Sequence, residues 1–251
     1  MTRKERIDAI IDIINKNGFV TVKFLTEELH YSTATINRDL NALENQNIVK
    51  RSYGGAEIVQ PKTTSLFFRY SKMRPVKNKI AQKASEFVQD GDMIFVDCST
   101  TAQYLGRYLT NKKDLTVITN NITLASYLSE WGIKAICLGG VIMEPPSMVY
   151  SSETIENAKK YGADKLFFSP SSVTPDGKIG ASNYEEHILL IKSMMENSKE
   201  VYMLCDHRKI TDACKKYLGT LKDIDVVITD FAFSNDIKDK YNETKYIEIE
   251  L

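Results

Sequence analysis

The sequence has few cysteines and lacks any long apolar segment. Its 251 residues include four cysteines, and no two of them have Cys-x-x-Cys spacing. Each lies in or beside an apolar segment, which favours reduced and mostly buried thiols in a cytoplasmic protein over a disulfide framework. No apolar stretch approaches the roughly 18 residues that mark a membrane-spanning helix, and the charged N-terminus begins no signal peptide. Neither secretion nor a membrane anchor is therefore expected.

Net charge is also absent, because 33 Lys and Arg residues balance 33 Asp and Glu residues. The balance nevertheless changes along the chain: residues 1–59 are neutral, residues 62–83 carry seven basic and no acidic residues, and residues 84–251 are acidic. Such a basic segment is either a solvated linker or a segment that lies near a phosphate backbone. Hydrophobic residues make up 43% of the chain, so a sizeable core is possible and global disorder is excluded.

The N-terminal part of the chain has the pattern of three helices followed by a hairpin. Isoleucines recur at spacings of three and four over 3–17, which predicts an amphipathic helix. Further helices are expected over 23–30 and 33–46, and the two short β segments of 48–59 flank a Gly-Gly turn. This order predicts an α+β winged helix-turn-helix domain over 1–59.

The remaining chain changes to alternating strands and helices. Prolines and weak periodicity predict a linker over 60–75. After it, apolar segments of strand length alternate with helices, which predicts an α/β domain with a mostly parallel sheet over 76–251. The expected strands are 93–96, 115–118, 135–138, 165–168, 201–204 and 226–228, and the expected helices are 102–109, 122–129 and 185–197.

The third predicted helix has the residue types of a DNA recognition helix. Its N-terminal half offers hydroxyl, amide and guanidinium groups, which contact phosphates or base edges when such a helix enters the major groove. We expect Arg38 to hold a guanine through two hydrogen bonds and Arg51, in the hairpin, to contact phosphates. An ordinary polar helix face would have the same composition, so these residue types alone leave both interpretations open.

The order of these segments resembles the N-terminal signature of DeoR-type transcription regulators. Ser32–Leu40, Leu43-Glu44 and Arg51–Ala56 are similar to the family pattern S-x-x-T-I-R-R-D-L, L-E and R-x-x-G-G-A, and Asn37 stands where the family has its first arginine. The resemblance implies a repressor that binds double-stranded operator DNA as a homo-oligomer, a dimer or a tetramer. The residues predicted to contact DNA are Ser32, Thr33, Thr35, Asn37, Arg38, Arg51, Tyr53, Gly54 and Gly55.

Four of the expected strands end in small polar or charged residues. Parallel strands end at one edge of a sheet, and the N–H groups that begin a helix attract anions, so we expect an anionic ligand at this edge. The first of these loops carries no cation, and we expect Lys209 to bring positive charge to Thr100. Each loop alone would also fit ordinary helix capping. The four loops are Asp97–Thr101, Thr119-Asn120, Gly139-Gly140 and Asp206–Lys209.

The same loops resemble the D-x-G-T-T, T-N, G-G and D-x-x-K motifs of the DeoR sensor domain, so the resemblance covers nearly the whole chain. That domain is similar in fold to ribose-5-phosphate isomerase and binds a sugar phosphate in many members. The resemblance implies that Ser99–Thr101 hold the phosphate, although Ser99 and Ser152 replace glycines of the family pattern. The residues predicted to bind this small phosphorylated sugar effector are Asp97, Ser99, Thr100, Thr101, Thr119, Asn120, Gly139, Gly140, Glu186, Asp206 and Lys209.

Three other interpretations remain open from the sequence. A carboxylate and a lysine beside a phosphate loop are also the groups of a sugar-phosphate isomerase-like enzyme, although the fused DNA-binding domain favours a regulator without catalytic residues. A second interpretation is that the C-terminal domain only oligomerises. The third is a metal site at Cys205, His207 and Cys214, but this spacing matches no common zinc pattern, and we expect neither a metal nor a cofactor.

Overall fold

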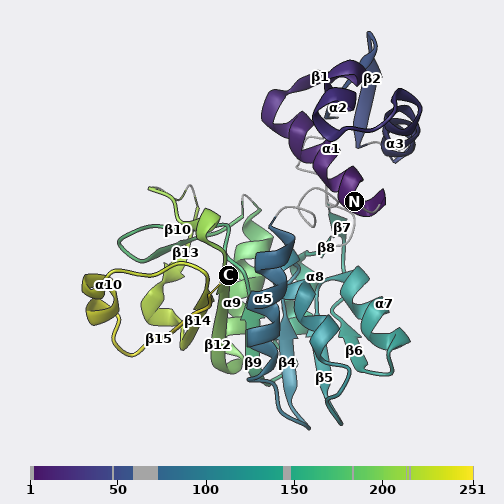
Figure 1. Ribbon diagram of the computed structural model, residues 1–251. Helices are drawn as coiled ribbons and strands as arrows, with labels where there is room; N and C mark the ends of the chain where they lie inside the picture. Colours follow the sequence, from purple (N-terminus) through teal and green to yellow (C-terminus); the bar gives the residue numbers. More distant parts are fainter. Residues whose placement is uncertain are drawn as a thin grey trace. The chain divides into compact units, whose positions relative to one another are not determined.

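The computed structural model describes residues 3–46, 48–58, 73–143, 148–182, 184–212, 214 and 216–250. The chain divides into two compact units, Met1–Lys72 and Met73–Leu251. Most of the linker predicted over 60–75 lies outside the described residues, and its last two residues begin helix α5 (Arg74–Ser85) (Figure 1). No described helix has the length and apolar character that crossing a membrane requires.

The described part of the N-terminal unit contains three helices and a three-stranded antiparallel sheet, as the winged helix-turn-helix prediction requires. The helices are α1 (Arg3–Asn17), α2 (Val22–Leu29) and α3 (Thr33–Asn45), and the strands are β1 (Phe19–Thr21), β2 (Val49–Ser52) and β3 (Gly55–Ile58). The strand order is β1-β3-β2, and the β2–β3 hairpin is the wing. Ser32 caps the N-terminus of α3, because its Oγ accepts a hydrogen bond from the Thr35 N–H at 3.3 Å.

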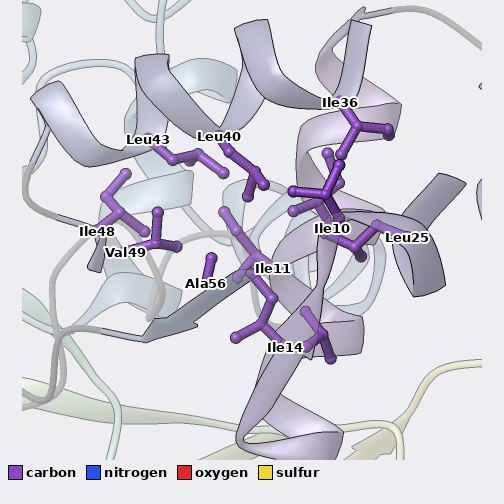
Figure 2. Packing of buried hydrophobic residues seen from close by; sticks show 12 residues of the cluster. Ile10, Ile11, Ile14, Leu25, Ile36, Leu40, Leu43, Ile48, Val49 and Ala56 are labelled. Carbon is purple, nitrogen blue, oxygen red and sulfur yellow. The ribbon is translucent and has the colours of Figure 1, made fainter. Parts of the chain in front are cut away.

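A single cluster of buried hydrophobic side chains holds this unit together. Figure 2 shows residues of all three helices and of the wing meeting in it, among them Ile11, Leu25, Leu40 and Ala56. The α3 members recur at spacings of three and four, so they face the core on one side of the helix. Apart from the buried Asp39, the polar residues of α3 are exposed or half-buried.

A buried ion pair also fastens α1 to α3. The Asp39 carboxylate is inaccessible to solvent and accepts a hydrogen bond from Arg6 Nε at 2.6 Å. This bond raises the pKa of the Arg6 guanidinium, which also lies 4.6 Å from the centre of the Tyr31 ring. Asp39 thus fixes the orientation of α3, and a carboxylate without its cation at this depth would be strongly destabilising.

The C-terminal unit is built on a seven-stranded sheet in which all neighbouring strands are parallel. The order is β15-β14-β12-β9-β4-β5-β6, so the predicted parallel α/β architecture is confirmed. The strands are β4 (Met93–Val96), β5 (Thr116–Thr119), β6 (Lys134–Cys137), β9 (Ala163–Phe168), β12 (Ser198–Cys205), β14 (Val226–Thr229) and β15 (Lys245–Glu248).

Helices cover both faces of this sheet (Figure 1). From the centre of the sheet, β4, β5 and β6 follow one another toward one edge, and the chain then crosses back to β9 on the other side of β4. Because crossovers between parallel strands are right-handed, the helices before this reversal lie on one face of the sheet and the helices after it lie on the other. The first group comprises α6 (Thr100–Gln103), the 3-10 helix η1 (Tyr104–Tyr108) and α7 (Ile122–Glu130), and the second comprises α8 (Ser152–Ala158) and α9 (Glu185–Glu196). The helix predicted over 102–109 is therefore a short α-helical turn continued by a 3-10 helix.

Several short elements of this unit were not predicted from the sequence. They include an antiparallel sheet of β10 (Ser172–Val173), β11 (Lys178–Gly180) and β13 (Tyr217–Thr220), the hairpin of β7 (Ile142–Met143) and β8 (Met148–Val149), the 3-10 helices η2 (His207–Lys209) and η3 (Leu221–Asp223), and helix α10 (Asn235–Lys240). Elements of two to six residues contain too few apolar positions for a period to be recognised.

The cysteines follow the prediction only in part. Cys98 and Cys205 are buried, whereas Cys137 is exposed on the edge strand β6 and Cys214 is half-buried. The expectation of mostly buried thiols is therefore wrong for Cys137.

Candidate functional site

The outward face of α3 carries the polar groups that the sequence analysis assigned to DNA. Ser32, Thr33 and Arg38 are exposed, and Thr35 and Asn37 are half-buried. Hydroxyl, amide and guanidinium groups thus lie on one accessible helix face, the arrangement that a helix needs to contact base edges and phosphates.

Arg51 of β2 reaches this same face. One terminal nitrogen of its guanidinium donates a hydrogen bond to Asn41 Oδ1, and the other donates to Asn37 Oδ1. Its backbone N–H donates to Glu44 Oε1 at 3.0 Å. The structure therefore joins Arg51 and Asn37, which the sequence analysis treated as separate contacts, and adds Asn41, which it did not include in the site.

The tip of the wing is shaped by its two glycines. Gly54 has a φ of +75°, and a Cβ atom on Gly55 would lie 2.3 Å from the Val20 carbonyl oxygen, so backbone geometry accounts for both glycines. Between β2 and Gly54, Tyr53 has a φ of +47° and a fully exposed side chain. The wing thus presents one aromatic ring to its surroundings.

In the C-terminal unit, the loop after β4 is buried and tightly bonded. Asp97, Ser99, Thr100 and Thr101 are all less than a tenth exposed. The Ser99 hydroxyl donates to Asp97 Oδ1 at 2.5 Å and accepts from the Ala102 N–H at 3.2 Å. Ser99, which replaces the family glycine, therefore caps α6 and orients Asp97.

A lysine from α5 enters this loop. Lys77 is only 6% exposed, and its Nζ donates a hydrogen bond to Thr100 Oγ1 at 2.8 Å. The loop itself carries no cation, and the cation that contacts it comes from α5, a source that was not predicted from the sequence. Lys77 shares the buried face of α5 with Ile80 and Ala84, at helical spacings of three and four, and this position in the sequence could have indicated an inward-facing lysine.

The loop after β5 lies beside the loop after β4. The side chain of Asn121 donates to Gln103 Oε1 at 2.7 Å and so links the start of α7 to α6. Thr119 Oγ1 accepts from the Asn121 N–H at 3.0 Å, and Asn120 Nδ2 donates to the Val149 carbonyl at 3.1 Å. Among the described residues, the buried Asn120 Oδ1 has no hydrogen-bond partner.

The two glycines after β6 have a local structural role. Gly139 and Gly140 have φ values of +68° and +116°, and a Cβ on Gly140 would lie 2.2 Å from Thr154 Oγ1. The Gly139 carbonyl accepts a hydrogen bond from that hydroxyl at 2.7 Å. These glycines allow the chain to pack against the start of α8, and their contact with an effector stays a prediction.

The fourth predicted loop, after β12, lies at the same edge of the sheet but farther along it. Strand β9 separates β12 from β4, so the two strands are about 10 Å apart at the usual interstrand spacing. Asp206 is buried and accepts from the Arg208 N–H at 3.2 Å, and Lys209 is half-buried in η2. The hydrogen bond to Thr100 comes from Lys77, and the predicted approach of Lys209 to Thr100 remains untested.

A pocket opens at the end of β9, next to the loop after β4. Ser169, Ser182 and His187 line it together with apolar residues of α9. His187 Nε2 lies 3.4 Å from Cys98 Sγ, and its Nδ1 lies 3.0 Å from Ser182 Oγ. Glu186, which was predicted to bind the effector, is exposed, and its neighbour His187 was not predicted from the sequence.

The three residues considered for a metal do not form a metal site. Cys205 is fully buried in β12, and burial raises the pKa of its thiol. Over the described ranges, no group of three or more His, Cys, Asp or Glu side chains is arranged to hold a metal ion.

Two family models match the chain, one in each unit. A DeoR-like helix-turn-helix domain matches residues 6–62, and a DeoR C terminal sensor domain matches residues 73–231. The chain belongs to the DeoR family. The resemblance that the sequence motifs indicated is thereby confirmed.

Curated relatives in this family are similar over most of the chain. The HTH-type transcriptional repressor GlcR of Bacillus subtilis (strain 168) is 34% identical over 92% of this chain and 89% of its own length. The Glycerol-3-phosphate regulon repressor of Escherichia coli (strain K12) is 27% identical over 92% of each chain. The Lactose phosphotransferase system repressor of Staphylococcus epidermidis (strain ATCC 12228 / FDA PCI 1200) is 29% identical over 99% of each chain.

Two solved structures are similar to part of the chain. Ribose 5-phosphate isomerase A from Methanocaldococcus jannaschii is 18% identical, with 56% of each chain covered and a TM-score of 0.43. The eIF2B delta structure from Chaetomium thermophilum is 17% identical, with 66% of this chain and 60% of that chain covered and a TM-score of 0.49.

Proposed function

We propose that this DeoR-family protein is a cytoplasmic bacterial repressor that binds operator DNA and responds to a small phosphorylated sugar. The observation that carries the proposal is the buried hydrogen bond of Lys77 to Thr100. The same chain also has a winged helix-turn-helix unit. Two of the relatives are named for a glycerol-3-phosphate regulon and for a lactose phosphotransferase system, which supports a sugar-related signal.

The DNA half of the proposal rests on the exposed face of α3 and on the wing. A single recognition helix contacts few base pairs, so two copies of the chain would read two half-sites and give useful specificity. We therefore propose a homo-oligomer, a dimer or a tetramer, on an operator with repeated half-sites.

The effector part of the proposal rests on the positive charge of Lys77 and on its burial. A phosphate monoester carries nearly two negative charges near neutral pH, and an enclosed ammonium attracts it more strongly than a solvated one. Lys77 and the hydroxyl groups of Thr100 and Thr101 would hold the phosphate. Asn120 Oδ1 would accept a hydrogen bond from a sugar hydroxyl.

The test measures both activities and their coupling on the full chain. Selection from random duplexes should enrich repeated half-sites, and a thermal-shift screen of glycerol 3-phosphate, glucose 6-phosphate, fructose 1-phosphate and ribose 5-phosphate should identify a stabilising compound. That compound should change the Kd for the selected duplex by roughly 5- to 150-fold, the usual range of allosteric coupling.

Inorganic phosphate and the unphosphorylated sugars serve as controls. A protein that selects no DNA motif at low salt is not a sequence-specific repressor. If a motif is selected but no sugar phosphate changes its Kd, the effector part of the proposal fails, and the result favours a C-terminal unit that only oligomerises. Conversion of a sugar phosphate to its isomer, followed by NMR, would instead support the isomerase-like interpretation.

A further inference from the structure

We infer that Arg51 of the wing reads a base edge, and that Asn37 and Asn41 of α3 are positioning residues that hold its guanidinium on the recognition face. The inference rests on the proposed function, because it requires an operator. It assigns to Arg51 a role different from the phosphate contact predicted from the sequence.

Three hydrogen bonds fix Arg51 against α3. Each terminal nitrogen of its guanidinium donates to one asparagine oxygen, and its backbone N–H donates to the Glu44 carboxylate at 3.0 Å. Asn37 and Asn41 are four residues apart, so they lie one above the other on the same helix face. The guanidinium therefore lies along the face of α3 instead of extending from the wing into solvent, where a flanking phosphate would meet it.

Half of the hydrogen-bonding capacity of the Asn37 side chain is already used within the protein. Its Oδ1 accepts from Arg51, and its Nδ2 donates to the Thr33 carbonyl at 2.9 Å. An asparagine that recognises adenine must use both of these atoms on the base. The side chain of Asn37 instead connects the backbone of its own helix to the arginine of the wing.

Arg51 keeps both its charge and part of its donor capacity. A guanidinium has five N–H donors, and the bonds to the two amides use two of them, which leaves three. Both acceptors are neutral, and among the described residues no ion pair links this guanidinium to a carboxylate, in contrast to Arg6 with Asp39. A guanidinium oriented in this way on a recognition helix matches the O6 and N7 acceptors of guanine.

The experiment compares base preferences of full-length variants on the duplex selected by the unaltered protein. Kd values are measured by fluorescence anisotropy on duplexes that carry each single base change in one half-site. Arg51→Lys keeps the charge and removes the planar fork. We expect it to abolish discrimination at one position, where the unaltered protein discriminates roughly 5- to 150-fold, and to retain the other positions.

The asparagine variants test the positioning role. Asn37→Ala and Asn41→Ala should weaken discrimination at that same position. The double variant Asn37→Ala/Arg51→Lys should lose no more base discrimination at that position than Arg51→Lys alone, because the two residues act as one unit. Lys50→Ala is the matched control: this exposed lysine adjoins Arg51 in β2, and its loss should weaken all duplexes alike and reduce the salt dependence of binding.

The outcomes separate this inference from the proposed function. If no motif is selected by the unaltered protein, the proposed function fails and the inference fails with it. If a motif is selected but Arg51→Lys keeps every base preference, Arg51 contacts phosphate and only the inference is overturned. It is also overturned if Asn37→Ala alters a different base position. Because all three side chains are at least partly exposed, far-UV circular dichroism should show each variant folded.

Discussion

The two units hold their candidate functional cations in different ways. In the N-terminal unit, Arg51 is half-exposed and lies against two amides on a helix surface. In the C-terminal unit, Lys77 is nearly inaccessible and donates to the hydroxyl of a buried loop. A DNA duplex can bind only at the surface of a protein, whereas a small ligand can be enclosed. The exposed position of Arg51 therefore suits DNA, and the buried position of Lys77 suits a small anion.

Solvent acts differently on the two cations. Salt screens a charge at the surface within about 10 Å at 0.1 M, but it screens a buried charge much less. Operator binding should therefore weaken steeply with added salt, while effector binding should change little. The following predictions test how far this division between the units holds, from the largest expected effect to the smallest.

The first prediction separates the stability of the two units. Leu40→Ala removes a fully buried side chain from the N-terminal core and should lower the free energy of unfolding of that unit by about 2–5 kcal/mol. Operator binding should be lost, while the thermal stabilisation by a sugar phosphate persists. Calorimetry of the full chain with and without the sugar phosphate measures both effects.

Leu190→Ala, at an equally buried position of α9, is the matched control and should give the reverse pattern. If Leu40→Ala also removed the response to the sugar phosphate, the two units would not be independent in stability.

The second prediction concerns the enclosed cation. Lys77→Met keeps the length of the side chain and removes its charge, which should weaken sugar phosphate binding by roughly 10- to 150-fold, because a hydrogen bond to a charged group contributes about 1.5–3 kcal/mol. Operator binding without effector should stay within a factor of two of the unaltered protein, on the order of the additivity error for separate sites. Isothermal titration calorimetry measures the first effect and anisotropy the second.

Two further variants serve as controls for Lys77→Met. Lys79→Met, on the exposed side of the same helix, should leave both affinities unchanged. Lys209→Met tests the cation that the sequence analysis favoured. A loss of effector binding in Lys209→Met with none in Lys77→Met would mean that the phosphate lies at the end of β12.

The third prediction concerns a cation that is paired with a carboxylate and has no proposed role in binding. Asp164 accepts from Lys199 Nζ at 2.8 Å and from the Met93 N–H at 2.9 Å, and the lysine bond is the main cause of the lowered pKa of Asp164. A lowered pKa means that the carboxylate stabilises the fold above its unfolded pKa, near 4, and that this contribution is lost as the pH falls through the folded value.

Asp164→Asn should therefore lower the free energy of unfolding at pH 7 by less than about 1 kcal/mol, since Lys199 is largely exposed. Near pH 2, the variant and the unaltered protein should unfold at the same urea concentration. An equal loss of stability at both pH values would show that packing, and not charge, accounts for the effect.

The sequence could predict long helices with regularly spaced apolar residues and strands made of consecutive apolar residues. The isoleucines of α1 and the apolar strand β4 appear where their patterns indicate. Contacts between distant residues were not accessible in this way. The bond of Lys77 to Thr100 depends on how α5 packs against α6, and the bonds of Arg51 depend on the register of the wing against α3. Composition supplies the residue types for such sites, but only the packing of elements determines which of them meet.

The position of β9 also bears on the order in which the protein is made. The hydrophobic residues described in the N-terminal core all precede residue 57, and they lie in elements that pair locally. The large sheet, in contrast, can join its two halves only after β9, which pairs with both β4 and β12, and the later strands up to β15 have left the ribosome. At about 5–20 residues per second, the 190 residues that follow Ile58, up to Glu248, take roughly 10–40 s. During that interval a nascent chain can have a folded N-terminal core and an incomplete C-terminal sheet.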